Sequence, residues 1–289
     1  MDRKRKISVV LLLVLLLFAA TIFHIASTYR DKSLKVIFLD VGQGDSILIS
    51  QGSQQILIDG GSDGKVLLEK LGRYIPFWDR KIEAVIATHP DQDHIGGLVD
   101  ALRTYKVENI IESRQKSSSQ IYKLLEETED KKHVERIIAQ KGEKLIFPYG
   151  AQMEILFPFS SDVDEQEQNN NAASIVSKLS FGRNSFLLTG DLPLEKEKVL
   201  MESGEDVESN VLKVAHHGSK YSTSNEFLDA VKPKEAIISV GANNKYGHPN
   251  AETLERLKNH GADILRTDEK GDVIFECPDL DANCLMASQ

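Results

Sequence analysis

Residues 88–97 read Thr-His-Pro-Asp-Gln-Asp-His-Ile-Gly-Gly, and this segment constrains the fold more than any other. Within six residues it places two imidazoles and two carboxylates, at His89, Asp91, Asp93 and His94. The run before it, residues 82–87, is rich in alanine and β-branched residues, a pattern typical of a buried strand. A strand end with clustered His and Asp indicates a site for divalent cations, zinc or manganese. The simpler interpretation is a polar turn with a helix N-cap, but four potential ligands in six residues favour metal.

The overall charge limits the choice of partners. The chain has 289 residues, enough for one large domain or two small ones, and a net charge of −9. Its first six residues carry +3, so the remainder carries about −12. This acidity argues against a broad electrostatic surface for nucleic acid. It does not exclude a nuclease whose metal ions neutralise a single phosphate locally.

The N-terminus has the pattern of a membrane-targeting segment. Basic residues at 3–6 precede an apolar run that starts at Val9 and reaches Ala26, close to the ~20 residues that span a bilayer. No clear cleavage site follows, so we favour a signal anchor at residues 1–27 over a cleaved signal peptide, with a linker at 28–33. The basic flank predicts a cytoplasmic N-terminus. The catalytic domain would then lie outside the cell membrane on a single span, or be secreted if the segment is cleaved.

Both cysteines, Cys277 and Cys284, lie close to the C-terminus. In an exported protein such a pair can form a small disulfide loop, with free thiols as the alternative. Their spacing does not resemble a metal site. We assign residues 277–289 to a C-terminal tail.

The rest of the chain alternates between strand and helix patterns, which predicts an α/β fold. Strands are expected at residues 34–39, 46–50, 55–59, 82–87, 174–179, 185–189, 211–215, 235–240 and 272–276. Helices are expected at 98–105, 120–140, 194–202, 225–231 and 251–260, and a polar acidic loop at 161–171. The two halves show a faint internal echo, in which paired strands end in an aspartate beside glycine. We therefore expect two sheets related by a pseudo-twofold axis, with helices outside.

Further potential ligands follow other predicted strands. Asp191 ends one strand and has the carboxylate needed to bridge two cations, although a Gly-Asp turn is the simpler interpretation. His216 and His217 end another strand, so one can bind metal while its neighbour faces substrate. His248 follows a Gly/Asn-rich loop, where a lone histidine is more often incidental. Aspartates and histidines at strand ends from both halves would form one dinuclear site that activates water.

Other catalytic classes lack their sequence patterns. The chain has no Gly-x-Ser-x-Gly nucleophile elbow and no phosphate-binding Walker loop. The glycines at residues 42–44 lack the following helix that a dinucleotide-binding turn requires. Ser219, beside the paired histidines, is better explained as a helix cap or an outer-shell donor.

Six motifs in order resemble the metallo-β-lactamase superfamily, and more narrowly the metallo-β-lactamase domain of ComEC-type competence proteins. They lie at residues 40–46, 57–61, 88–97, 187–191, 212–219 and 246–249. The resemblance extends over residues 34–276 and implies an αββα sandwich with the active site along one edge. It implies two divalent metal ions.

The resemblance also assigns the ligands. The family's His-x-His-x-Asp-His motif falls on His89, Asp91, Asp93 and His94, with aspartate in place of the second histidine. A bridging ligand falls on Asp191, a later histidine ligand falls on the 216–217 pair, where we favour His217, and an early structural aspartate falls on Asp59. The family's histidine between these motifs has no match, because residues 169–171 are all asparagine.

ComEC-type proteins carry this domain outside the membrane beside a channel that imports single-stranded DNA, and the domain is thought to degrade the other strand. We therefore expect an extracytoplasmic metal-dependent phosphodiesterase, a nuclease acting on DNA, and predict no protein partner. Asp93 would accept a proton or bind metal, and His216 and His248 would orient substrate. Lys213 would lie near a phosphate, although a lysine on a strand is usually just solvated. The alternatives are hydrolysis of another envelope phosphoester such as phosphorylcholine, and a non-catalytic envelope binding protein.

Overall fold

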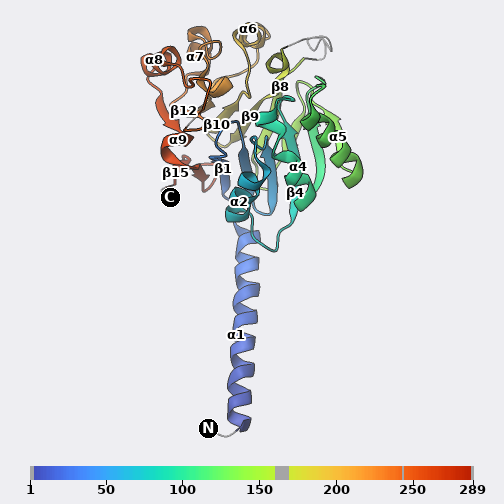
Figure 1. Cartoon of the computed structure of the whole chain (residues 1–289). Helices are drawn as coiled ribbons and strands as arrows, with labels where there is room; N and C mark the ends of the chain where they lie inside the picture. The colour runs from blue at the N-terminus through green and yellow to red at the C-terminus, as the bar shows by residue number, and fades with distance from the viewer. Residues whose placement is uncertain (1–2, 160–168, 243, 288–289) are drawn as a thin grey trace.

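The computed structural model describes residues 3–159, 169–242 and 244–287. A globular head stands at the end of one long helix, α1 (Arg3–Arg30), as Figure 1 shows. The expected acidic loop at 161–171 lies mostly outside the described residues, and its end forms a short 3-10 helix, η1 (Asn170–Ala173).

Two sheets form the head. The first has the strand order β15-β14-β1-β2-β3-β4-β5-β6 and the second has the order β13-β12-β11-β10-β9-β8-β7. The strands of the first sheet are β1 (Leu34–Phe38), β2 (Ile47–Gln51), β3 (Gln54–Ile58), β4 (Lys81–Ala87), β5 (Lys106–Glu112), β6 (Glu135–Ile138), β14 (Val273–Cys277) and β15 (Leu285–Met286). Those of the second are β7 (Lys144–Ile146), β8 (Gln152–Phe157), β9 (Val176–Phe181), β10 (Asn184–Leu188), β11 (Val211–Lys213), β12 (Glu235–Ile238) and β13 (Asp263–Arg266).

The sheets pack face to face and helices cover their outer faces. Apolar residues that alternate along the strands, such as Phe38, Phe186 and Phe275, fill the space between the sheets. Helices α2 (Gly64–Tyr74), α4 (Leu98–Thr104) and α5 (Gln120–Lys132) pack on the first sheet. Helices α6 (Leu194–Glu202), α7 (Asn225–Val231) and α8 (Ala251–Asn259) pack on the second. The predicted αββα sandwich is therefore confirmed.

The internal echo corresponds to a repeated supersecondary unit. In the first sheet, the antiparallel pair β2–β3 is followed by β4, which runs parallel to β3. In the second, the antiparallel pair β9–β10 is followed by β11, which runs parallel to β10. The carboxyl ends of the parallel strands in each unit carry the aspartates and histidines predicted as ligands.

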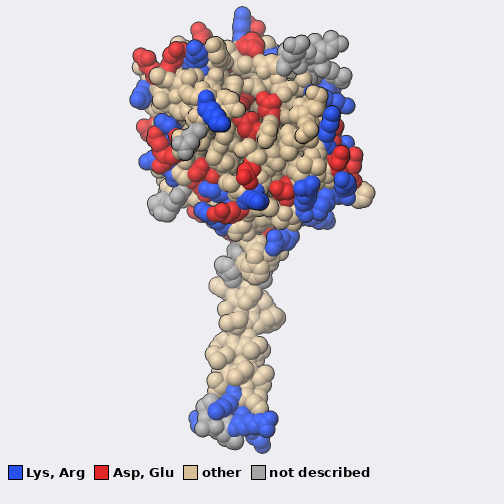
Figure 2. All heavy atoms as spheres, in the orientation of Figure 1, with Lys and Arg blue, Asp and Glu red and all other residues tan. Residues whose placement is uncertain are grey.

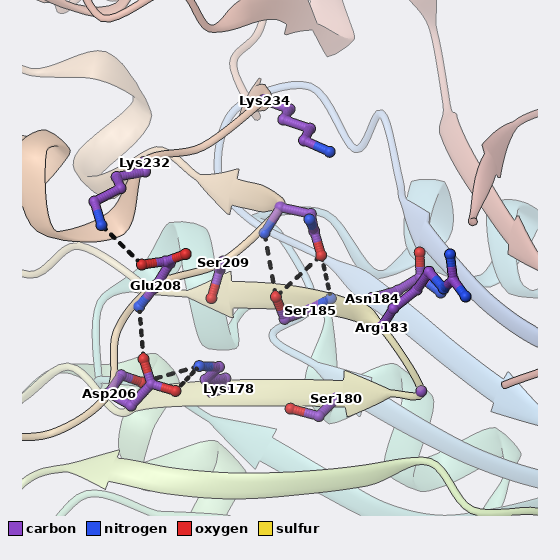
Figure 3. Close-up of a pocket in the computed structure, with 12 residues that line it drawn as sticks. Lys178, Ser180, Arg183, Asn184, Ser185, Asp206, Glu208, Ser209, Lys232 and Lys234 are labelled. Carbon is purple, nitrogen blue, oxygen red and sulfur yellow. Dashed lines mark hydrogen bonds and ion pairs between the residues drawn. The ribbon is translucent and has the colours of Figure 1, made fainter. Parts of the chain in front are cut away.

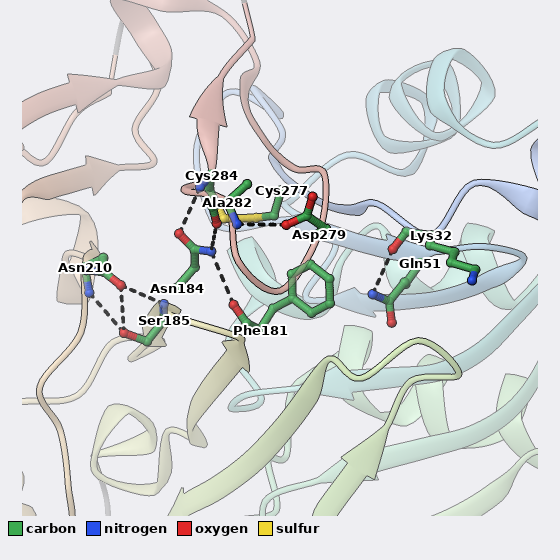
Figure 4. The surroundings of a disulfide bond; sticks show 10 residues. All are labelled: Lys32, Gln51, Phe181, Asn184, Ser185, Asn210, Cys277, Asp279, Ala282 and Cys284. Carbon is green, nitrogen blue, oxygen red and sulfur yellow. Dashed lines mark hydrogen bonds between the residues drawn. A yellow bond between two sulfur atoms is a disulfide. The ribbon is translucent and has the colours of Figure 1, made fainter.

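Several predicted boundaries are wrong. The helix expected at 120–140 ends at Lys132, because His133 takes a left-handed conformation (φ 56°) and residues 135–138 form β6. Helix α1 continues through Arg30 and includes half of the expected linker. The expected C-terminal tail contributes to the head: β15 pairs with β14, and a disulfide joins Cys277 to Cys284 beside the β9–β10 turn (Figure 4).

Helix α1 has the length and composition of a membrane span. The stretch Arg3–Phe23 is long and apolar enough to cross a bilayer. Residues 7–23 contain no charged residue, and Figure 2 shows Lys and Arg gathered at the tip of the helix. This is the helix predicted to be the signal anchor.

The two ends of the sheets are chemically different places. The chain enters the head at Leu34, which pairs with Gln51, and Gln51 pairs with Gln54, so β1 and β3 start at the same end. Because β4 is parallel to β3, it starts there too. We call this the anchor end. The predicted ligands lie at the opposite end, which we call the site end, roughly 20 Å away along strands of five to seven residues.

Candidate metal centre

Strand ends from both sheets deliver the predicted ligands to one place. His89 follows β4, and Asp93 and His94 belong to the single-turn helix α3 (Gln92–Ile95), which begins inside the predicted loop. Asp191 follows β10, and His217 lies in the 3-10 turn η2 (Ala215–Gly218) after β11. Residues separated by more than one hundred positions therefore become neighbours.

Four imidazole nitrogens approach the Asp191 carboxylate. The Nε2 atoms of His94 and His217 lie 3.3 and 3.5 Å from Asp191 Oδ2, and those of His89 and His216 both lie 3.9 Å from it. His217 Nε2 is also 3.4 Å from Asp93 Oδ2. The ligand atoms form overlapping groups: one is His89, His94 and Asp191, and another is Asp93, His94 and His217. Two further groups include Asp45, one with Asp59 and His94 and one with Asp191 and His217.

The far side of each ring is held by another group. His94 Nδ1 lies 2.7 Å from Asp59 Oδ2, and His217 Nδ1 donates to the Ser239 carbonyl at 2.9 Å. His89 Nδ1 lies 3.0 Å from the Thr88 hydroxyl, which itself donates to Asp59. Such contacts fix the ring orientation, so that Nε2 faces the centre, where it can give its lone pair to a cation that displaces a proton.

The atoms that face the centre have no hydrogen-bond partner among the described residues. They are the Nε2 atoms of His89, His94 and His217 and the Oδ1 atom of Asp191. Burying an unpaired polar atom costs about 1–3 kcal/mol, so four such atoms in one cluster require a shared ligand. Three imidazoles and two carboxylates fit a divalent cation of the zinc or manganese type.

The electrostatics of the cluster also favour a cation. Burial lowers the pKa of His94, but Asp191 and Asp59 outweigh burial and hold that pKa well above its usual range. Burial likewise lowers the pKa of His217, but Asp191 and Asp45 raise it to about 10. Burial raises the pKa of Asp191, yet His217 and His94 hold it well below its ordinary value. The carboxylates thus create a negative potential that attracts positive charge to this position.

Backbone strain places the paired histidines. His216 and His217 both have left-handed backbone conformations, with φ of 51° and 53°, and Gly218 follows with φ 81°. A non-glycine residue in this region costs about 1–2 kcal/mol. The strained turn sends the two rings in different directions, with an interplanar angle of 74°. Only His217 is buried at the centre, as the sequence predicted; His216 faces the opening.

The other predicted residues line the rim of a cavity of about 120 Å³ above the centre. Asp91 Oδ2 is 3.8 Å from His89 Nε2, and its Oδ1 accepts from Asn170 at 2.6 Å. His216 and His248 face each other with ring centroids 5.5 Å apart. Asp91 is more exposed than the convergent ligands, so its role as a ligand stays a prediction.

The asparagines that replace the family's histidine do lie at this site. Asn170 holds Asp91, and Asn171 Nδ2 lies 3.4 Å from His216 Nδ1. They therefore position residues of the rim, which the sequence did not reveal.

Lys213 corrects one expectation, and Asp45 is a residue that the sequence reasoning missed. The Lys213 side chain is fully buried, with Nζ 2.7 Å from Asp45 Oδ2 and 2.9 Å from the Val214 carbonyl. It therefore cannot reach a phosphate. Asp45 in turn lies 3.3 Å from His217 Nδ1. Its only signal was its place in the motif at residues 40–46, in a loop without a neighbouring histidine.

A larger hollow, about 540 Å³, lies at the anchor end, between the start of β10 and the loop before β11 (Figure 3). Lys178 pairs there with Asp206, and Lys232 pairs with Glu208. It contains none of the predicted ligands, so we place the chemistry in the smaller cavity.

Solved structures show the same fold at low sequence identity. The metallo-beta-lactamase fold protein YhfI from Bacillus subtilis superimposes with a TM-score of 0.57 at 14% identity, over 84% of this chain and 99% of that one. CmlA, a diiron beta-hydroxylase from Streptomyces venezuelae, gives 0.50 at 14% identity, over 81% and 52%.

Curated relatives are more similar in sequence. ComE operon protein 3 of Bacillus subtilis is 34% identical over 83% of this chain, and Recombination protein 2 of Haemophilus influenzae is 30% identical over 90%. Competence protein ComA of Neisseria gonorrhoeae is 28% identical over 90%. The chain spans about a third of the length of each, 33%, 31% and 35%. The family model of the metallo-beta-lactamase superfamily matches residues 39–242, so the chain belongs to this superfamily and resembles the corresponding domain of ComEC-type competence proteins.

Proposed function

We propose that this chain is a membrane-anchored, extracytoplasmic phosphodiesterase that hydrolyses DNA with the help of two divalent metal ions, zinc or manganese. The observation that carries the hydrolase is the convergence of three partnerless Nε2 atoms on Asp191. The relatives named for competence and recombination support nucleic acid as the substrate. The basic tip of α1 supports a cytoplasmic N-terminus and a head outside the cell.

His89, His94, His217, Asp93 and Asp191 would hold the ions, with Asp91 at the outer edge. When bound, such cations supply Lewis acidity and bring the pKa of water toward neutrality. Asp59 and the Ser239 carbonyl keep the imidazoles of His94 and His217 directed at the centre.

Asp93 would either bind a metal ion or accept a proton from the attacking water. Burial raises its pKa, but His217 and His94 outweigh burial and hold the pKa below its ordinary value, so the carboxylate is ionised at neutral pH. Gln43 Nε2 lies 3.4 Å from Asp93 Oδ2 and orients it. His216 and His248, at the opening, would donate hydrogen bonds to phosphate oxygens, and Asn171 would hold His216 in position.

A smaller phosphoester of the cell envelope, such as phosphorylcholine, is the second candidate. The size of the cavity, about 120 Å³, favours it, because a polymer would have to lie across the rim and leave most of its length outside. The net charge of −9 points the same way, since polymer binding depends on basic surface.

Hydrolysis assays with defined metals test the proposal. The full chain, stripped with a chelator and reloaded with Mn²⁺ or Zn²⁺, is given single-stranded DNA, double-stranded DNA, a chromogenic phosphodiester and a phosphorylcholine ester. We expect cleavage of DNA and of the chromogenic diester, and loss of both with His94→Ala. The matched control is His260→Ala, which removes a histidine that contacts Asp229 far from the centre.

The outcomes separate the three candidates. Cleavage of the phosphorylcholine ester without cleavage of DNA would favour the second candidate. Stoichiometric metal without hydrolysis of any substrate would contradict both enzymes and leave a binding protein.

A further inference from the structure

The loop between α2 and β4 presents an aromatic pair at the anchor end, in which Phe77 is exposed and Trp78 is half-buried. Phe77 is 76% exposed, and its ring meets the Trp78 ring edge to face at 4.8 Å. Helix α2 runs from the site end to the anchor end, so the loop lies beside the place where α1 joins the head (Figure 1). An aromatic pair with one exposed ring, beside the candidate span, matches the aromatic belt at bilayer interfaces.

The loop is held so that Phe77 stays outside. On one side Ile75 is buried in the core under the first sheet. On the other, Asp79 Oδ2 accepts from Gln55 Nε2 at 2.9 Å, and its backbone N–H donates to the Pro76 carbonyl at 2.8 Å. The exposure of Phe77 is therefore a property of an ordered turn.

Cations flank the aromatic pair. Arg80 and Lys106 adjoin through a backbone hydrogen bond of 2.7 Å and are both exposed, and in the described part of the chain neither makes an ion pair. Arg183 and Lys234, on the rim of the larger hollow, lie at the same end and likewise have no ion pair within the described ranges (Figure 3). Figure 2 shows Lys and Arg side chains, interspersed with Asp and Glu, on the side of the head that adjoins α1.

We propose that the anchor end of the head docks on the bilayer surface, with Phe77 inserted at the interface and Arg80 and Lys106 against anionic lipid headgroups. The occupant follows from α1, because its candidate span ends at Phe23 and only residues 24–33 separate that span from β1. So short a connection keeps the loop at the surface of whichever bilayer holds α1. Docking would point the metal centre away from the membrane, toward extracellular substrate. The inference rests on the anchoring part of the proposed function and is independent of catalysis.

The chain carries its own probe, since Trp78 is its only tryptophan. The full chain is reconstituted in vesicles of phosphatidylglycerol and phosphatidylcholine, in which some lipids carry bromine high on the acyl chains. We expect brominated lipids to quench Trp78 and the vesicles to shield it from acrylamide. Phe77→Ser should reduce the lipid quenching roughly twofold or more, since it removes the apolar area that would be buried. Arg80→Glu with Lys106→Glu should reduce it in anionic vesicles only.

Tyr221→Ser is the matched control, because Tyr221 is 65% exposed but follows η2 at the site end. It should leave the quenching unchanged. Flotation of the vesicles reports anchoring separately. A chain that floats with Trp78 open to acrylamide and unquenched by lipid overturns docking alone, and a chain that does not float overturns anchoring as well. All variants should hydrolyse a soluble phosphodiester like the parent, so a failed DNA assay leaves the docking result standing.

Discussion

The site end and the anchor end of the same strands have opposite unfavourable features. At the site end, polar atoms are buried without partners and His216 and His217 accept strained backbones. At the anchor end, an apolar side chain, Phe77, is exposed while the neighbouring loop is tied to the sheet. Each end carries the feature that folding alone disfavours, buried unpaired polarity at one and exposed apolar surface at the other. In our proposals a partner relieves the local cost at each end, metal ions at the site end and a bilayer at the anchor end.

The largest effect on the site end should come from replacing Asp191, the carboxylate that the proposed ligands share. Asp191→Asn removes the carboxylate that four imidazoles approach, so we expect loss of bound metal and a fall in hydrolysis of about a thousandfold, equivalent to ~4 kcal/mol. Metal content by mass spectrometry and the rate on a chromogenic phosphodiester measure it. Asp206→Asn, a carboxylate that pairs with Lys178 at the anchor end, is the control and should change neither. Full metal content in Asp191→Asn would rule out the assigned centre.

A smaller loss should follow from Asp59→Asn, which leaves every proposed ligand in place. Asp59 holds His94 Nδ1 at 2.7 Å and accepts from the Thr88 backbone and hydroxyl. Removing such an orienting contact typically costs 10–100-fold in metal affinity or activity. Added metal should restore much of the rate, because the ligands remain.

The control for this orienting role is at the other end of the neighbouring strand. Glu83→Gln also converts a carboxylate to an amide, at a side chain that accepts from the Gln55 backbone. It should leave metal affinity unchanged. An Asp59→Asn protein that binds metal like the parent would reduce Asp59 to a purely structural residue.

How much of this centre the sequence reveals depends on whether a residue acts through its own motif or through a distant partner. His89, Asp93, His94, Asp191 and His217 each end a strand or follow one, and the structure brings them together as predicted. Lys213 looked like a phosphate ligand because a strand pattern does not show what faces a side chain. Its partner, Asp45, is 168 positions away, a pairing that only the packing of the two sheets creates.

The secondary structure was likewise predicted in some places and not in others. Strands with continuous apolar runs, such as β4 and β10, were predicted, whereas β5, with its alternating polar residues, was not. The over-long helix prediction failed at His133, because its Glu/Lys-rich pattern continues past the point where the backbone turns left-handed. Local composition gives no signal for a turn made by a non-glycine residue.

A pH experiment tests whether a buried carboxyl group next to the metal centre makes the stability of the protein depend on pH. Glu112, at the end of β5, is buried beside a small cavity that His89 also lines. Burial raises its pKa to about 8, helped by Glu129 and Glu126 and opposed by Arg136 and Lys116. The folded state therefore holds a proton that the unfolded chain, with a pKa near 4.5, releases. Stability should fall as the pH rises from 4.5 to 8, by about 1.4 kcal/mol per unit at most, and level off above.

Glu112→Gln should remove this slope, since its amide does not titrate. The free energy of unfolding in urea, measured from pH 4.5 to 9 for both proteins, gives the difference. We expect the variant to gain stability relative to the parent as the pH rises. A constant difference across this range would mean that Glu112 is ionised in the folded protein.

The smallest effect is expected at the anchor end, from the disulfide. Cys277 pairs in register with Leu34, where the chain enters the head, and Cys284 donates its backbone N–H to Asn184 beside the larger hollow. Opening so short a loop with Cys277→Ser and Cys284→Ser should cost about 2 kcal/mol of stability. Urea unfolding measures this cost, while metal content and hydrolysis at the site end should stay at parental values. If hydrolysis fell together with stability, a change at the anchor end would have reached the metal centre through β14 and β1. The two ends would then differ in chemistry but would not be structurally independent.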